Sequence, residues 1–265
     1  MISKRLIGVI TVRDGWAVQS FGYRRHLPLG RPELLAENLD RWGVDEILLQ
    51  CTDRSRQGLG PDLALLERIS CKGLSTPLIY QGGIRHVADG VAAVQAGAER
   101  IAMDSLLRDD PHQAAALAGP LGAQALIGVL PLSPGMGRGA APLWLDHRSG
   151  HSTPIPSAVT DVLHSGAISE LMLVDWRHEG HSGAFDAGLL DAAEQAGSLL
   201  AGLPLIAFGG LNEPAQLRQV LQRPAVVAAA VGHFLCWREH AVQQLKAQLL
   251  GLPLRPSMHA GASVF

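Results

Sequence analysis

The sequence has few cysteines, few aromatic residues and little net charge, and each scarcity excludes a class of protein. Its cysteines, Cys51, Cys71 and Cys236, are an odd number without CxxC spacing, which argues against a disulfide framework and for a reducing compartment. A net charge of −2 gives no basic footprint for nucleic acid. The apolar run near the N-terminus is broken by Arg13 and Asp14 after about seven residues, too short for a signal peptide or a membrane span. We therefore expect a cytoplasmic protein without nucleic-acid or membrane partners.

Aliphatic residues make up for the missing aromatic ones. Hydrophobic residues form 47% of the 265 positions but aromatic residues only 5%, so the core must consist mainly of Leu, Val, Ile and Ala. This composition is typical of parallel strands layered under helices. The uniform composition favours one large α/β domain over two small ones.

Short apolar runs alternate with amphipathic segments along the chain. The expected strands are Arg5–Thr11, Glu46–Cys51, Leu78–Gln81, Arg100–Asp104, Gln124–Leu130, Glu170–Asp175, Leu205–Phe208 and Val226–Gly232. The expected helices lie near Pro32–Trp42, Pro61–Cys71, His86–Gln95, Pro111–Ala118, Pro156–His164, Asp186–Leu199, Pro214–Leu221 and Trp237–Leu250. Eight such units predict an α/β protein with a single (β/α)8 TIM barrel.

An internal repeat strengthens this prediction. The segment PLIYQGGIR that contains Gly82 recurs as PLIAFGGLN around Gly209, and Glu46 is repeated 124 positions later as Glu170. The chain therefore reads as two duplicated half-barrels. We place the barrel at 1–250, its halves at about 1–120 and 121–250, and a loosely held C-terminal tail at 251–265. The long loop from Ser133 to Pro156 is rich in Gly, Pro and Ser and is expected to form a flap over the site.

The carboxyl ends of barrel strands carry the chemistry in this fold, and two glycine pairs lie there. Bare N–H groups at such turns can hold a phosphate, although a Gly-Gly pair also simply permits a tight turn. The residues assigned to phosphate or substrate binding are Gly82, Gly83, Asp104 and Ser105 in one half, and Gly180, Gly209, Gly210, Gly232 and His233 in the other. The duplication predicts a substrate with a phosphate or phosphate-like group at each end. Asp104 conflicts with this, because a carboxylate repels phosphate.

Candidate acid–base groups at the same end are Asp14, Asp53, Asp175, His178, Glu179 and His181. We expect Asp53 and Asp175 to face each other across the mouth as the catalytic pair, and Asp14 to be a turn residue. The run from His178 to His181 lacks the spacing of HExxH, so no metal site is predicted. No cofactor is expected either.

Four charged residues open strands at the opposite, amino end of the barrel: Arg5, Glu46, Arg100 and Glu170. Charges at strand starts are usually exposed on the rim. The alternative is a ring of two ion pairs that closes the barrel floor.

With these residues placed, the chain resembles the HisF family, the cyclase subunits of imidazole glycerol phosphate synthase, over roughly residues 1–250. The similarity lies in KRLIGVITVRDG, WGVDEILL, PLIYQGGI, GAERIAM, GAQALIGV, ISELMLVD followed by EGHSGAFD, and PLIAFGG. The resemblance implies a barrel that takes ammonia from a class I glutaminase docked on its floor. It also implies an ammonia gate formed by Arg5, Glu46, Arg100 and Glu170, and a channel glutamine at Gln124.

The chain departs from that family at specific positions. The two aspartates that serve the cyclases as acid and base are replaced by Thr11 and Pro131, an asparagine that binds phosphate by Asp104, and a lysine near the mouth by Gln19. Losing both aspartates should abolish ring formation, since each such group is worth on the order of 10²–10⁴ in rate.

These departures favour the HisF-like proteins of sugar amidation, and the stretch FGYRRHLPLGRP from Phe21 to Pro32 looks closer to that branch. Those proteins work with a glutaminase and pass ammonia to a separate amidotransferase that converts an N-acetyl group to an acetamidino group on surface-polysaccharide sugars. Two alternatives stay open: a cyclase of histidine biosynthesis that uses Asp53 and Asp175, and a barrel without catalysis that only activates the glutaminase. A related isomerase is disfavoured, because it needs the same two strand-end aspartates.

Overall fold

Eight parallel strands close into a barrel, as the sequence predicts. In this computed structural model, which describes residues 3–135, 140–195, 197–236 and 240–255, each strand pairs with the next around the ring and β10 also pairs with β7. The barrel strands are β1 (Arg5–Arg13), β4 (Glu46–Cys51), β5 (Leu78–Gln81), β6 (Arg100–Met103), β7 (Leu126–Ser133), β10 (Glu170–Asp175), β11 (Leu205–Phe208) and β12 (Val226–Val231). The chain is therefore a (β/α)8 TIM barrel.

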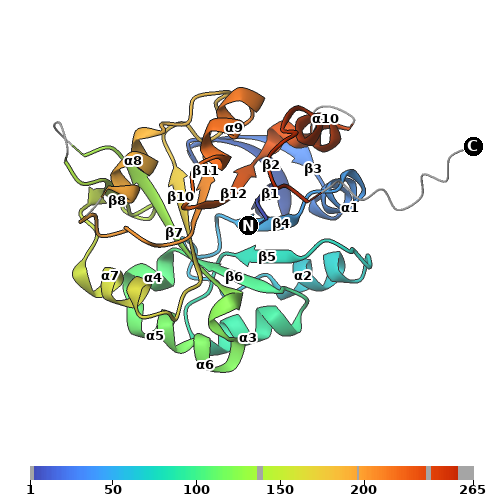
Figure 1. Ribbon diagram of the computed structural model, residues 1–265. Coiled ribbons are helices and arrows are strands. Elements are labelled where there is room, and N and C mark those ends of the chain that lie inside the picture. The colour runs from blue at the N-terminus through green and yellow to red at the C-terminus, as the bar shows by residue number, and fades with distance from the viewer. Residues whose placement is uncertain (1–2, 136–139, 196, 237–239, 256–265) are drawn as a thin grey trace, which may run out of the picture.

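Helices surround the strands in an outer layer (Figure 1). They are α1 (Pro32–Trp42), α2 (Leu63–Ser70), α3 (Val87–Gln95), α4 (Ser105–Asp109), α5 (Pro111–Ala116), α6 (Ala118–Leu121), α7 (Ser157–His164), α8 (Gly188–Glu194), α9 (Pro214–Leu221) and α10 (Ala241–Gln248), with 3-10 turns η1 (Ala123–Ala125) and η2 (His233–Cys236). Proline at the first helical position starts α1, α5 and α9, where its missing N–H removes no helical bond. No helix in the described residues is long and apolar enough to cross a membrane.

Several expected boundaries differ from those observed. The fifth barrel strand begins at Leu126 and continues through Pro131 to Ser133, because Gln124 belongs to η1. The expected fourth strand ends one residue early, since Asp104 is the residue before α4. The helix expected over Asp186–Leu199 is the shorter α8, and the tail residues 256–265 lie outside the described residues. Residues 237–239 of the last expected helix also lie outside them.

Alternate residues of each strand point into the barrel, and these side chains form a core of their own. The inner cluster consists of Ile7, Val9, Leu48, Ile79, Ala102, Ile127, Val129, Met172, Val174, Ile206, Phe208, Ala228 and Ala230. The intervening residues pack outward against the helices in a second, larger cluster. Because strand side chains alternate, this pattern fixes which residues at either strand end face the barrel axis.

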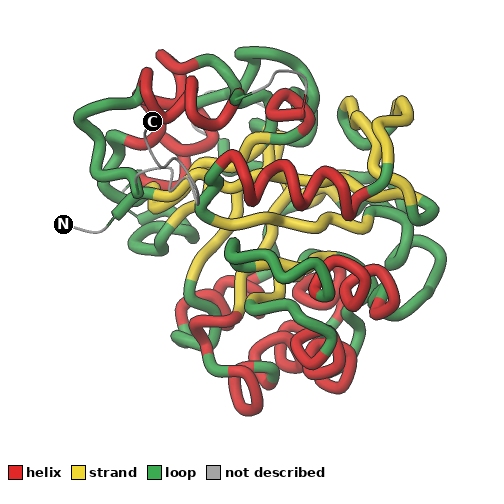
Figure 2. Tube along the Cα trace, turned by 90° about the vertical axis from the view of Figure 1, so that its right-hand side faces the viewer, coloured by secondary structure: helices red, strands yellow, loops and turns green. Residues whose placement is uncertain are grey.

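Two hairpins that the sequence did not predict are attached to this barrel. β2 (Trp16–Phe21) and β3 (Arg25–Gly30) form an antiparallel pair between β1 and α1, where a loop was expected. A strand pair projects from one end of the barrel beside the long helix α1 in Figure 2. The expected flap contains β8 (Leu143–Leu145) and β9 (Ser152–Thr153), which extend the sheet from β7; its residues 136–139 lie outside the described residues.

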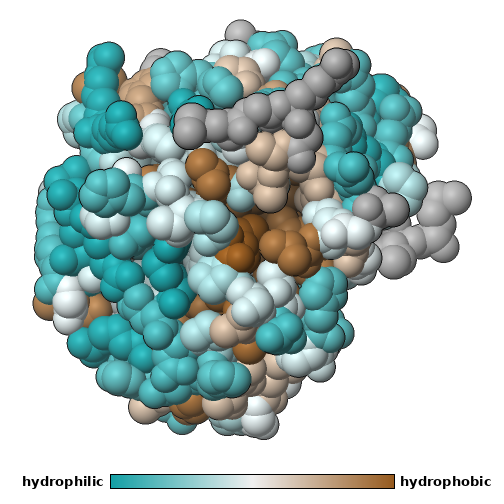
Figure 3. Space-filling model, turned by 90° about the vertical axis from the view of Figure 1, so that its left-hand side faces the viewer, coloured by the Kyte–Doolittle hydropathy of each residue, from teal (hydrophilic) through white to brown (hydrophobic). Residues whose placement is uncertain are grey.

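A second cavity of about 630 Å³ lies beside the barrel, between the first part of the flap and α8. Figure 3 views the side of the molecule on which α7, α8 and β8 lie. This face is largely hydrophilic, with a group of apolar residues near its centre. The ionisable residues that line this cavity are all acidic, Asp186, Asp191 and Glu194. It lies outside the barrel and lacks a cationic residue among its described lining, so the candidate site is sought at the barrel mouth.

Candidate functional site at the barrel mouth

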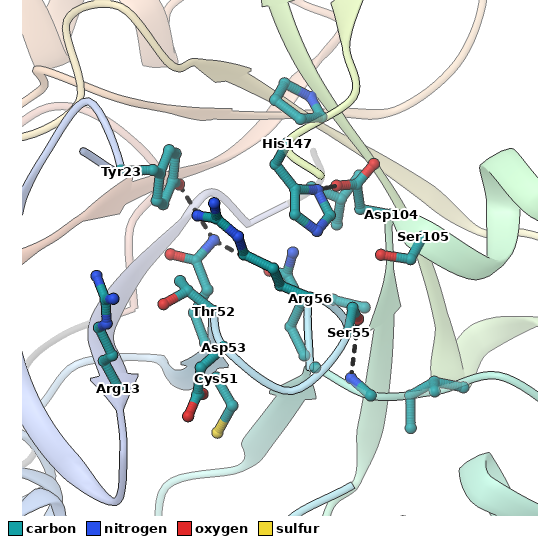
Figure 4. A pocket seen from close by; sticks show the side chains of 18 of the residues that line it. Arg13, Tyr23, Cys51, Thr52, Asp53, Ser55, Arg56, Asp104, Ser105 and His147 are labelled. Carbon is teal, nitrogen blue, oxygen red and sulfur yellow. Dashed lines mark hydrogen bonds and ion pairs between the residues drawn. The ribbon is translucent and has the colours of Figure 1, made fainter. Parts of the chain in front are cut away.

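A cavity of about 470 Å³ opens at the carboxyl ends of the strands. Its base is formed by inward-facing residues of the barrel, among them Ala102, Val129 and Val174. Polar side chains from the loops form its walls, and Figure 4 shows Arg56 extending across the cavity toward Tyr23. A cavity of this size with an apolar base and a few polar groups suits a small molecule.

The first glycine pair, Gly82-Gly83, lines this cavity and has a structural reason to be glycine. Both residues have positive φ, +134° and +69°. A Cβ on Gly82 would collide with the carbonyl oxygen of Cys51, and one on Gly83 would lie 2.5 Å from the carbonyl oxygen of Gly60. The Gly83 N–H points to the cavity side and donates to Ser55 Oγ at 3.2 Å. The tight turn is thus required, and its N–H is donated to the Ser55 hydroxyl, which lines the cavity.

Asp104 and Ser105 also line the cavity (Figure 4). The Asp104 carboxylate is already engaged by the flap: Trp144 Nε1 donates to Oδ1 at 3.2 Å, and His147 Nδ1 lies 3.0 Å from Oδ2. Trp144 is fully buried, with the Arg108 guanidinium 3.8 Å above its ring. The structure therefore gives Asp104 flap residues as hydrogen-bond partners.

The second glycine pair repeats the backbone of the first but lies outside the cavity. A Cβ on Gly209 would collide with the carbonyl oxygen of Asp175, just as Gly82 is confined by Cys51. The remaining residues assigned to this half, Gly180, Gly210, Gly232 and His233, do not line the cavity either. Instead the ring of Phe21, from the β2–β3 hairpin, packs 5.3 Å from the His233 ring. Burial and the nearby His181 lower the pKa of His233 to about 4.

Asp53 and Asp175 do not face each other across the mouth. Asp53 lines the cavity, and its Oδ2 accepts from the Asp14 N–H at 2.9 Å. Asp175 is fully buried on the outer side of β10, because it follows the inward-facing Val174. Its Oδ2 accepts from His178 Nδ1 at 2.7 Å and from the backbone N–H of Asp186 at 2.8 Å. Asp175 therefore holds the loop after β10 together. Its counterpart in the first half-barrel is the core residue Cys51.

Thr11 and Pro131 occupy inward-facing positions at the ends of β1 and β7. They continue the alternation of Val9 and Val129, and neither carries a group that exchanges a proton near neutral pH. The Cys51 thiol also lines the cavity, but burial raises its pKa to about 12, so it is no nucleophile. Neither strand end therefore offers a proton-transfer group at this position.

Loop residues that the sequence did not single out supply much of the cavity wall. Arg56 comes from the loop after β4, His147 from the flap, and Tyr23 from the turn of the β2–β3 hairpin. Tyr23 has φ of +56°, and its hydroxyl accepts from Gln50 Nε2 at 3.1 Å. No motif surrounds these residues. The only available signal was their position after a predicted strand.

Glu179 anchors that hairpin to the loop after β10. Its Oε2 accepts from Ser20 Oγ at 2.9 Å and from the Tyr23 N–H at 3.2 Å, and its carbonyl oxygen accepts from the Gly22 N–H at 2.9 Å. Burial raises the pKa of Glu179 to about 7, against the lowering effect of these donors. Gly180 follows with φ of +81°, and the backbone of Ser20 occupies the space that a side chain would need. Both residues thus position the hairpin.

At the opposite end of the barrel, the four floor charges form one ring of ion pairs. Arg5 lies 3.2 Å from Glu46 and 2.8 Å from Glu170. Arg100 likewise lies 3.2 Å from Glu46 and 2.9 Å from Glu170. All four side chains are at most 15% exposed. Each of the four stands two residues before an inner-cluster residue of its strand, so all four face the barrel axis in the layer below that cluster. The ring therefore spans the barrel axis.

A backbone carbonyl group also accepts a hydrogen bond from this ring of ion pairs. Arg100 Nε donates to the carbonyl oxygen of Gln124 at 3.0 Å, while the Gln124 residue is exposed. Burial opposes the charge on Arg5, but the carboxylates of Glu46 and Glu170 outweigh it and raise the pKa of the guanidinium. Burial raises the pKa of Glu46, with Arg5 and Arg100 acting against it. The ring contains two positive and two negative groups, so it is neutral as a whole.

Together these features define a ligand-binding (β/α)8 barrel with a neutral ring of ion pairs at its floor. A family model described as "Histidine biosynthesis protein" matches residues 5–240, and the chain belongs to this family. It is 26% identical over 264 residues to the imidazole glycerol phosphate synthase subunit HisF of Oleidesulfovibrio alaskensis, covering 94% of this chain and 96% of the relative. It is 28% identical over 266 residues to the subunit of the same name from Hyphomonas neptunium, covering 96% and 99%.

Proposed function

We propose that this chain is a HisF-like barrel subunit that receives ammonia at its floor and passes it along the barrel for amidation of a phosphorylated or nucleotide-linked sugar in surface-polysaccharide synthesis. The observation that carries the proposal is the combination of an intact floor ring with a mouth that lacks the cyclase acid and base. A barrel selected for ring closure would need the proton-transfer groups that Thr11 and Pro131 replace.

The floor ring supports the ammonia route. Arg5, Glu46, Arg100 and Glu170 hold one another across the axis, and the apolar inner cluster lies directly above them. A buried ring of charges costs desolvation energy that apolar residues would not. Its retention at the barrel entrance suggests a role in admitting a small polar molecule. The ammonia donor in this proposal is a class I glutaminase docked on the floor.

The mouth supports delivery to an acceptor rather than ring closure. Arg56 and Arg13 supply positive charge, and Ser55, which accepts the Gly83 N–H, supplies a hydroxyl. Among the described residues that line the cavity, Asp53 and Asp104 are the carboxylates, and Asp104 is bound by the flap. The transfer itself is therefore assigned to a separate sugar amidotransferase that works with this barrel.

The complex isolated through a tag on this chain tests the proposal. We expect it to release glutamate from glutamine and to incorporate the labelled amide nitrogen of glutamine into a sugar product. The variant Arg100→Met should reduce incorporation from glutamine while labelled ammonium still supports it. A matched control is Arg223→Met, which removes ion pairs of 2.7 and 2.8 Å to Asp191 and Glu194 outside the barrel. Equal loss from both nitrogen sources in Arg100→Met, or the same loss in the control, would contradict the route.

The alternative function is that of the relatives themselves, and it rests on their similarity along nearly the whole chain. In that case the purified chain, given ammonium and the ribulosyl aminoimidazole intermediate, should form imidazole glycerol phosphate. Asp53 would have to act as the base, since Asp175 is buried outside the cavity. Any turnover that Asp53→Asn abolishes would establish this alternative and overturn amidation. A third reading, a barrel that only activates the glutaminase, predicts glutamate release without any labelled product.

A further inference from the structure

The duplicated halves offer two glycine turns of the same backbone form, but the structure treats them differently. Gly82-Gly83 opens to the cavity, whereas Gly209-Gly210 does not line it. The difference cannot come from the turns, because each is confined in the same way by the strand beside it. It comes from what lies above them.

The first turn is surrounded by groups that suit an anion. Arg56 crosses the cavity, Ser55 Oγ accepts the Gly83 N–H, and Ser105 also lines the cavity (Figure 4). A guanidinium is matched to the geometry of a phosphate. The one carboxylate beside these groups, Asp104, is held by Trp144 and His147.

In the second half, the β2–β3 hairpin packs against the loop after β10 and against His233. The Phe21 ring packs between two histidine rings, 5.9 Å from His181 and 5.3 Å from His233. His233 is only 6% exposed. The hairpin is fastened at this place by Glu179, which receives the Ser20 hydroxyl and the Tyr23 N–H. An aromatic ring thus packs against His233, one of the residues assigned to the second anion site.

Tyr23 forms the boundary between the two halves of the mouth. It packs against the inner cluster and bonds to Gln50, which also bonds to Gln81 at 3.2 Å. All three residues line the cavity. This wall, toward which Arg56 extends, therefore consists of a phenol and two amides, which are neutral and suit hydroxyl groups.

We propose that this cavity binds a ligand with a single phosphate, held between the Ser55 hydroxyl beside the Gly82-Gly83 turn and the Arg56 guanidinium, and that the rest of the ligand is an uncharged polyol that meets Gln50 and Gln81. The ligand class is a sugar monophosphate rather than a bisphosphate. The inference deepens the proposed function. The assignment of a sugar rests on that proposed function, whereas the requirement for a single phosphate rests on the geometry of the cavity alone.

Calorimetric titration of the full chain with fructose 6-phosphate and fructose 1,6-bisphosphate tests this. We expect the two to bind with affinities within about threefold of each other, because the second phosphate finds no partner. Arg56→Gln should weaken both by about tenfold or more, the usual effect of losing a charge-assisted hydrogen bond. Arg24→Gln is the matched control, since Arg24 is an exposed cation of the β2–β3 hairpin and does not line the cavity.

Phe21→Ala provides the converse test. Removing the ring should raise the affinity for the bisphosphate alone, while the monophosphate is unaffected. Bisphosphate binding more than about tenfold tighter than monophosphate binding in the unaltered chain, or binding of both that ignores Arg56→Gln, would overturn the proposal. So would absence of binding by either compound. None of these results depends on a glutaminase or on ammonia, so the ligand class and the proposed function fail separately.

Discussion

Removing one carboxylate from the floor ring should destabilise the barrel far more than removing one from its surface. The variant Glu170→Gln keeps the side-chain shape but withdraws the partner that lies 2.8 Å from Arg5 and 2.9 Å from Arg100. Glu46 then has to balance both guanidinium groups, and the ring changes from neutral to a net charge of about +1.

The expected magnitude follows from burial. Breaking a fully buried pair costs about 3–5 kcal/mol, and an exposed pair about 0–1 kcal/mol. The ring residues are at most 15% exposed, and Glu46 still pairs with both arginines, so we expect a loss of about 2–3 kcal/mol for Glu170→Gln. For a chain of this size that corresponds to a fall in Tm of roughly 4–12 °C.

Thermal unfolding followed by circular dichroism measures this directly. The matched control is Asp191→Asn, which removes a partner 2.7 Å from Arg223 but at a side chain that is 67% exposed. The control should change Tm by no more than about 2 °C, and its effect should vanish in about 1 M NaCl, whereas the effect of Glu170→Gln persists. Equal shifts in both variants, or a shift of Glu170→Gln that salt abolishes, would refute the reasoning from burial.

Three further predictions concern the loops at the mouth. The pKa of Glu179 is raised to about 7, so its stabilising contribution is complete below about pH 4.5 and is lost as the pH rises through 7. Relative to Glu179→Gln, the chain should therefore lose roughly 3 kcal/mol or less of stability between pH 5 and 8. Parallel curves of Tm against pH for the two proteins would contradict this. Asp175→Asn should lower stability by about 1–3 kcal/mol in chemical denaturation yet leave sugar-phosphate affinity unchanged, whereas a lost affinity would place Asp175 in the site. Trp144→Phe removes the donor to Asp104 and should speed limited proteolysis of the flap, and an unchanged cleavage rate would show that this hydrogen bond does not hold it.

The sequence was sufficient for the barrel because the relevant signals are local and repeated. Each strand is an apolar run, and the recurrence of Glu46 as Glu170 and of Gly82 as Gly209 fixes the equivalence of the halves. The same alternation that buries Ile7 and Val9 determines where the floor charges point. Strand periodicity thus carries information about the floor as well as about the core.

The mouth could be predicted only in part, since its geometry depends on loops without periodicity. Asp175 was expected in the cavity, but the alternation of β10 turns it outward; counting residues from the inner core would have shown this. Arg56 and His147 reach the cavity only through loop conformations that no motif announces. The β2–β3 hairpin is set by long-range contacts to Glu179, which no local pattern reveals.

The strand pairs that follow β1 and β7 differ between the two duplicated halves. Gly82 and Gly209 lie in equivalent backbone positions, each confined by the carbonyl group of the neighbouring strand. Above one of them the cavity is open, and above the other Phe21 fills the space between two histidine rings. Because the turns themselves are equivalent, a difference in ligand charge between the two poles has to come from the loops. The duplicated strands supply the scaffold, and in our proposal the segment between β1 and α1 contributes to the choice of which half a ligand uses.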